Sequence, residues 1–332
     1  MAIKRSGDIG VRVFGAIIVL LAALFIAVQT PTVQKLIASA ALSSIEKKID
    51  GKVSVGGLVI ESANSFLLRD VVIVDDGPQR LADTVFTAAR IAGTLSGKSL
   101  FGGGGIRLSR LEITDAMVHY IYEDDRILRS NFERIISSRK RAELEAKAAL
   151  QGQPIPQNAA DSLAAIVKAD DFRADKVIIK GLRFIMHDPY KERYMRSADA
   201  INYSDLDARG DIEISDLSMN NGFFQATVDN AVLSEKCGYH VNSISARVKA
   251  GHGRVSVEKI RFDDGFSKVY APLYSMTSTC DTAYRNYTHM VRMKAVLDKS
   301  HVSSKTISAF GLGVLHASDI NLDVTGVGME GF

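Results

Sequence analysis

The sequence predicts a mainly β protein in which an N-terminal transmembrane helix is followed by an elongated, curved, antiparallel β-groove with a helical insertion. Three observations predict this fold class. An apolar run stands near the N-terminus, a short pattern typical of bent strands recurs from residue 52 onward, and one helix-forming stretch interrupts it. We expect residues 1–30 to hold a membrane anchor, 31–51 an amphipathic helix, and 52–332 the β body, with the insertion at about 130–170.

The composition excludes two classes of protein. Hydrophobic residues make up 46% of the 332 residues and charged residues 24%, so the chain can bury a core and is not disordered. The formal net charge is only +3 and no long basic block occurs, although a dedicated nucleic-acid binder needs clustered Lys and Arg for its phosphate contacts. We therefore expect no nucleic acid among the partners.

The N-terminal run has the length and flanks of a signal-anchor. No residue from Val13 to Val28 has a polar side chain, and extension to Ile9 gives a helix of about 30 Å, the thickness of a hydrocarbon core. Lys4, Arg5 and Arg12 come first, which places the N-terminus in the cytosol and the body across the membrane. A cleaved signal peptide and a buried core helix are the alternatives.

A second helix is expected directly after the anchor. Thr30-Pro31 is typical of a helix start, apolar residues then follow at helical spacing, and Gly51 is expected to end the helix. This helix has one apolar face, with which it can lie on the membrane surface or cover the end of a sheet.

The recurring pattern in the body is apolar-x-apolar-x-x-apolar-x-apolar. Each half has the period of a strand with one apolar face, and the extra residue between the halves requires a β-bulge or tight bend to keep both halves on the same face. Tyr239–Ala246 is a weaker copy. The strong copies, which are also the expected lining of the groove, are Val53, Val55, Leu58, Ile60; Ile106, Leu108, Leu111, Ile113; Val177, Ile179, Leu182, Phe184; Ile212, Ile214, Leu217, Met219; and Val255, Val257, Ile260, Phe262.

Other alternating runs fit further antiparallel strands joined by short turns such as Asp264-Gly265. About fifteen strands at ~4.8 Å each predict a sheet roughly 70 Å long. Its apolar face must be covered by helices, fold on itself or bind something else. The runs are Leu68–Val74, Val85–Leu95, Met117–Tyr122, Phe224–Leu233, Val269–Tyr274 and Val291–Leu297.

The insertion is predicted by a change of composition. Glu133–Leu150 is rich in Ala, Glu, Arg and Lys, residues 151–156 contain two prolines, and Ala159–Val167 predicts a second short helix. The Arg139-Lys140-Arg141 group is a solvated helix face or, alternatively, a contact for lipid headgroups.

No pattern of catalytic or metal-binding residues stands out, so we expect no enzyme, cofactor or metal site. The segment Ala92–Ser99 has the loose spelling of a phosphate-binding loop, but glycines follow where a helix should begin. The seven histidines are dispersed. Paired aspartates such as Asp263-Asp264 are typical of turns, with a Ca²⁺ site as the alternative. Cys237 and Cys280 either remain free or form one disulfide, and the sequence leaves both possibilities open.

Taken in order, these features resemble the N-terminal part of the TamB branch of the AsmA-like superfamily. The resemblance covers most of the chain but rests on residue type and spacing. It is carried by the signal-anchor, the amphipathic helix, Val53–Ile60, Phe66–Ile73, Leu95–Lys98, Ile106–Tyr122, the helical insert that Phe132 leads, and Val177–Asp188.

The resemblance implies a groove with an apolar interior in the periplasm of a Gram-negative bacterium, anchored in the inner membrane by one span. Such proteins are similar to bridge-like lipid transfer proteins, and the TamB branch is associated with an outer-membrane barrel assembly partner. Members of that branch are longer and have a C-terminal β domain. We therefore expect a truncated or split relative, or a second chain that continues the groove.

The expected function is to shelter or conduct phospholipid for outer-membrane biogenesis. The physical basis is an apolar strip that can bury acyl chains, at about 0.8 kcal/mol for each CH₂. Two alternatives are an assembly factor that offers strand edges to outer-membrane proteins and a purely structural envelope protein.

Overall fold

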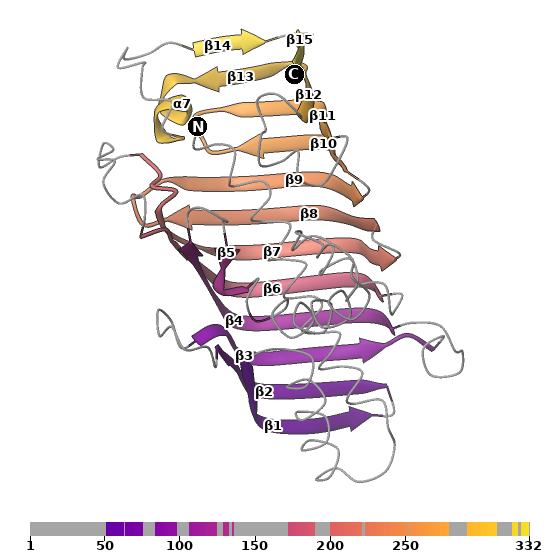
Figure 1. Cartoon of the computed structure of the whole chain (residues 1–332). Coiled ribbons are helices and arrows are strands. Elements are labelled where there is room, and N and C mark those ends of the chain that lie inside the picture. The colour runs from indigo at the N-terminus through magenta and orange to yellow at the C-terminus, as the bar shows by residue number, and fades with distance from the viewer. Residues whose placement is uncertain are drawn as a thin grey trace, which may run out of the picture.

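The computed structural model has one long, curved β-sheet (Figure 1). It describes residues 51–62, 64–75, 84–97, 106–124, 129–132, 135, 172–189, 200–220, 223–251, 253–278, 291–310, 321–324 and 327–331. The expected transmembrane helix and nearly all of the amphipathic helix and the insertion lie outside these residues. Gly51, expected to end the second helix, is the first residue of a strand. In the described part of the chain, no helix is both long and apolar enough to span a bilayer.

The described elements are fifteen strands and one short helix. Twelve strands follow one another across the sheet in the order β1-β2-β3-β4-β6-β7-β8-β9-β10-β11-β12-β15, and β5, β13 and β14 lie beside this path. At ~4.8 Å for each spacing the path is about 50 Å long, shorter than the 70 Å expected from fifteen strands in a row. The bounds are β1 Gly51–Ser62, β2 Ser65–Asp75, β3 Thr84–Leu95, β4 Ile106–Asp124, β5 Arg129–Ser130, β6 Phe172–His187, β7 Asp205–Asn220, β8 Phe223–Glu235, β9 His240–Gly251, β10 Arg254–Asp263, β11 Lys268–Ser278, β12 Val291–Leu297, β13 Ser300–Ser303, α7 Ser304–Ala309, β14 Asn321–Val324 and β15 Val327–Gly331.

The main prediction, a long curved antiparallel sheet, is confirmed with one correction. Strands β4 and β6 pair in parallel, with Ile113 opposite Ile179, whereas their neighbours are antiparallel. Since β4 and β6 run in the same direction, residues 125–171 must cross from the end of one strand to the start of the next. The interruption that the sequence places at 130–170 therefore coincides with the one parallel step in the described sheet.

A second correction concerns strand length. The runs Ile106–Ile113 and Met117–Tyr122 were expected as separate strands, but both belong to the 19-residue strand β4. The chain bends instead of turning back at Asp115, which has a positive φ of 51°. At the end of β4, the buried Asn131 side chain accepts a hydrogen bond from the Ile121 N–H (3.0 Å) and donates one to the His119 carbonyl (2.7 Å).

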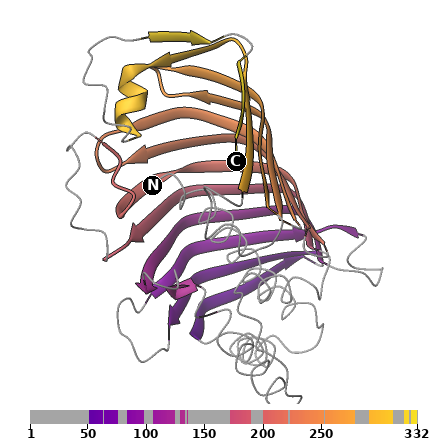
Figure 2. The same cartoon turned by 45° about the horizontal axis from the view of Figure 1, so that its top comes forward.

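A bulge with a left-handed residue is present in three of the five strong copies. In the copy Val53–Ile60 the register of β1 and β2 does not shift between the two apolar pairs. The second residue between the two apolar pairs has a left-handed backbone at Gly181, Asp216 and Lys259, with φ of 64°, 53° and 54°. The strand register shifts at each of these positions. Because a bulge increases local twist and bends the strand, a series of them curves the whole sheet, as Figure 2 shows.

Two glycines show how closely the strands approach at the bends. A Cβ atom on Gly181 would lie 2.6 Å from Oδ1 of Asp115 on β4, in addition to the strain of the positive φ. A Cβ atom on Gly93 would lie 2.3 Å from the ring of Phe66, which is directly opposite on β2. The Phe66 ring thus fills the space over a residue that has no side chain.

Candidate functional site

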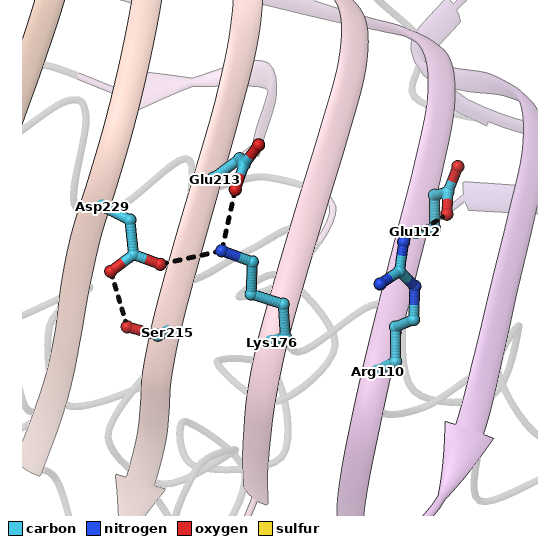
Figure 3. A network of polar contacts seen from close by, with 6 residues as sticks. All are labelled: Arg110, Glu112, Lys176, Glu213, Ser215 and Asp229. Atoms are coloured by element: carbon cyan, nitrogen blue, oxygen red, sulfur yellow. Dashed lines mark hydrogen bonds and ion pairs between the residues drawn. The ribbon is translucent and has the colours of Figure 1, made fainter.

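The two faces of the sheet differ in chemistry because side chains alternate along each strand. Figure 3 shows charged side chains of one face: Lys176 Nζ lies 2.8 Å from Glu213 and 2.9 Å from Asp229. Hydrogen bonds to Glu213 and Asp229 raise the pKa of Lys176. Farther along, Arg110 pairs with Glu112 at 3.1 Å, and that hydrogen bond is the main cause that lowers the pKa of Glu112. We call this the polar face.

The other face carries an apolar row that crosses ten neighbouring strands. The register places each member directly opposite the next, so the row runs along the length of the sheet and across its strands. At ~4.8 Å for each strand it is roughly 40 Å long. The members of this apolar row are Leu58, Leu68, Ile91, Ile113, Ile179, Ile212, Ala231, Ile244, Phe262 and Val269.

Burial along the apolar face changes from one end of the sheet to the other. In β2–β4 the face is closed: Val71 is 0% exposed, and Ile91 and Val118 are each 1% exposed. Val257, Ile260 and Phe262 on β10 are only half-buried, as are Tyr274 and Met276 on β11. Strands β9–β12 therefore expose more of their apolar side chains than β2–β4 do.

The predicted lining residues lie on this face wherever their side chains are described. Nine are buried, namely Val53, Leu108, Leu111, Ile113, Val177, Ile179, Ile214, Leu217 and Met219. Nine are half-buried, namely Val55, Leu58, Leu182, Phe184, Ile212, Val255, Val257, Ile260 and Phe262. Ile60 and Ile106 have side chains outside the description. Four of the half-buried members lie on β10, and the others lie on β1, β6 and β7. The half-buried members are the ones accessible to a ligand.

Sequence reasoning missed several members of the same face. Phe66, Leu68, Val71 and Ile73 of β2 form a full copy of the pattern, with Asp70 (φ 50°) at its bend. In β4 the bent pattern Leu111–Val118 overlaps the predicted copy that ends at Ile113. The apolar pattern is clear in the sequence of β2. In β4 it is weaker, because alanine, here Ala116, is a poor indicator of an apolar face.

A polar cluster at one end of strands β9–β11 consists of Tyr239, Asp264, Ser267 and Thr306. Tyr239 is half-buried, and the other three are buried. The Asp264 carboxylate accepts hydrogen bonds from the Tyr239 and Thr306 hydroxyls (2.5 Å each) and from the N–H of Ser267 (2.6 Å). Burial opposes ionisation of Asp264, but the hydrogen bonds from Thr306, Tyr239 and Ser267 lower its pKa overall. Asp264-Gly265 forms the expected turn, between β10 and β11.

The same cluster joins elements that are far apart in sequence. Thr306 belongs to α7, whose N-cap is Ser303, and the N–H of Ser303 donates to the Ser267 hydroxyl at 2.8 Å. Phe310, which ends α7, packs edge-on against the Tyr239 ring at 5.4 Å between centroids. The helix is thereby fixed to the turns at one end of β9, β10 and β11.

Potential catalytic groups do not come together in the described residues. No group of three metal-ligating side chains occurs within that part of the chain. Burial lowers the pKa of His119, with smaller contributions from His187 and Arg183. Cys237 is a free thiol whose pKa is raised mainly by burial, and Cys280 lies outside the described residues. What the site offers is apolar surface.

No protein-family model matches the chain, and a search of curated proteins finds no significantly similar sequence.

Proposed function

We propose that the protein shelters phospholipid acyl chains on its apolar face, as an inner-membrane-anchored, periplasmic, TamB/AsmA-like protein of outer-membrane biogenesis. The observation that carries this proposal is the apolar row. It continues without a charged residue over ten strands and is half-buried in β9 and β10. A face that only closed a core would be covered along its whole length.

Physical chemistry favours an apolar chain as the ligand of such a face. Each CH₂ that leaves water contributes about 0.8 kcal/mol, and no directional contact is needed. A row that crosses the strands lets a ligand shift along the sheet from one apolar position to the next. Directed movement then requires partners, for which an outer-membrane barrel assembly protein or a second chain that continues the sheet is proposed.

The test is lipid retention by the full-length protein and two matched variants. Val257→Glu adds a carboxylate to the half-buried apolar face of β10, whereas Thr277→Glu adds one to an exposed position on the polar face of β11. All three proteins are purified in the same detergent, and bound phospholipid is quantified by mass spectrometry. Wild type and Thr277→Glu are expected to retain phospholipid, and Val257→Glu to lose most of it.

All three proteins have the same N-terminus. Any phospholipid bound at a membrane anchor is therefore the same in each sample, and a difference between variants reports on the apolar face. Equal phospholipid in all three would contradict the proposal. Little phospholipid in every sample would favour the structural alternative, in which the apolar face serves only the fold.

An assembly role is a second candidate, favoured by the first edge of the sheet. In the described structure β1 pairs only with β2, and Val59 on β1 is 44% exposed. An edge strand of this length can accept another strand by β-augmentation. A photo-crosslinking residue at Val59 that captured only outer-membrane β-barrel proteins, with no phospholipid bound to the purified chain, would favour this role over lipid transfer.

A further inference from the structure

The polar face has a hollow over β6–β9, next to the bend at Gly181. It has a volume of about 460 Å³, and Leu182, Gly210 and Leu233 are among the residues that line it. One wall is a row of polar side chains that the register places side by side: Arg183, Arg209, Ser234 and His240. The opposite wall consists of Asp211 and Val232.

Strands β7 and β8 approach so closely at Gly210 that this position has no space for a side chain. A Cβ atom on Gly210 would lie 1.9 Å from the carbonyl oxygen of Val232 on the next strand. On the other side of the bend, the N–H of Gly181 donates to Oδ1 of Asp211 at 2.7 Å, which fixes that carboxylate at the edge of the hollow. The close approach of β7 to β8 and this hydrogen bond thus hold two of the residues that line the hollow, Gly210 and Asp211.

The two arginines that line the hollow, Arg183 and Arg209, share one carboxylate, that of Asp207. Arg183 uses two donors in a fork with Asp207, at 3.0 and 2.7 Å. Arg209 approaches the same carboxylate only at 3.9 Å, and its side chain is 65% exposed. One carboxylate thus faces two guanidinium groups, and its short contacts go to Arg183. Among the contacts of the described residues, Arg209 keeps its guanidinium donors for a ligand, beside the His240 imidazole, whereas the Ser234 hydroxyl donates to the Arg209 carbonyl at 3.4 Å.

We propose that this hollow binds a phosphate group, carried either by a small soluble molecule or by a lipid headgroup. A guanidinium group binds phosphate oxygens with two parallel N–H bonds, and neighbouring donors on adjacent strands suit a tetrahedral group better than a planar carboxylate. Asp211 on the opposite wall opposes an anion, which limits the affinity. The site lies on the polar face, so it goes beyond the proposed function and does not require the apolar face to hold lipid.

Calorimetric titration of the full-length protein with inorganic phosphate, in detergent without other multivalent anions, tests the site. Arg209→Gln should weaken binding at least about tenfold, as expected for the loss of a charge-assisted hydrogen bond. Asp211→Asn keeps an acceptor for the Gly181 N–H and removes the negative charge, so it should tighten binding several-fold. Arg254→Gln changes an exposed arginine at the start of β10, away from the hollow, and should have no effect.

A parallel titration with dihexanoylphosphatidylglycerol distinguishes the two sources of phosphate. Tighter binding of this soluble phospholipid than of inorganic phosphate, lost in Arg209→Gln, assigns the hollow to a headgroup. The reverse order assigns it to a free phosphate compound. The proposal is overturned if neither compound binds, or if Arg254→Gln weakens binding as much as Arg209→Gln does. Either result leaves the lipid retention experiment on Val257 unaffected.

Discussion

At the scale of the residue, Lys259 adopts a backbone conformation that lysine rarely has. Its φ is 54°, at the bend of β10, and its side chain is exposed. A left-handed backbone costs an L-residue about 1–2 kcal/mol, whereas glycine adopts it without that cost but loses more entropy on folding. Lys259→Gly is therefore expected to raise the free energy of unfolding by about 0.5–1 kcal/mol, measured by chemical denaturation.

The matched control is Lys294→Gly. Lys294 is also exposed, but it lies within the regular pairing of β11 and β12. There glycine only loses entropy, so the variant should be about 0.5–1 kcal/mol less stable than wild type. If both substitutions destabilise the protein equally, Lys259 does not carry the strain of a bend.

At the scale of the element, the polar cluster at the end of the sheet makes stability depend on pH. The pKa of Asp264 is lowered in the folded chain, so its ionised form stabilises the fold above the ordinary aspartate pKa, and this contribution is lost as the pH falls through the folded pKa. Asp264→Asn keeps the shape but has no charge to lose. The difference in denaturation midpoint between wild type and Asp264→Asn should thus shrink between pH 6 and pH 3.

A second substitution separates the charge from the hydrogen bonds. Asp264→Ala leaves the Tyr239 hydroxyl and the N–H groups of Phe266 and Ser267 without their acceptor, which is expected to cost at least about 2 kcal/mol at pH 6. A difference between wild type and Asp264→Asn that does not change with pH would show that the charge contributes nothing to the link between α7 and the strands.

The strands and their bends were largely predictable from the sequence, whereas their pairing was not. The period of two and the extra residue predicted β6, β7 and β10 with their bends, because both depend only on neighbouring residues. The parallel pairing of β4 with β6 could not be predicted, since a strand such as Ile106–Ile113 shows the same alternation beside a parallel or an antiparallel partner. The polar cluster was also missed: Asp264 was interpreted as a turn residue, and its contact with Thr306 joins residues far apart in sequence.

The candidate site was predictable in part, because alternation along a strand depends only on neighbouring residues. Alternation identified the apolar face, so residues such as Val177 and Val257 were assigned to it correctly. It gave no indication that Val177 is 2% exposed while Val257 is half-buried, because cover comes from segments that are distant in sequence. The hollow with Arg209 was invisible for another reason, since four strands must pair in register before its wall exists.

At the scale of the whole molecule, the gradient of burial divides one continuous sheet into a closed part and an open part. Residues such as Val71 and Val118 are removed from water, whereas the same face of β10 and β11 is half-buried. Backbone opening requires less free energy where fewer apolar contacts are lost. Amide hydrogen exchange measured by mass spectrometry should therefore be slower in β2–β4 than in β10–β12, although all of these strands belong to the same sheet.

A bound acyl chain should slow amide exchange mainly in β10–β12, where the apolar face is half-buried. A ligand that occupies the half-buried residues adds apolar contacts to β10–β12 and stabilises the state that binds it. Protein that retains phospholipid is then expected to exchange more slowly in β10–β12 than delipidated protein, with little change in β2–β4, where Val71 and Val118 have no room for a ligand. Uniform slowing over all strands would instead indicate a general effect of lipid on the fold, and no change in any strand would place the lipid away from the apolar face.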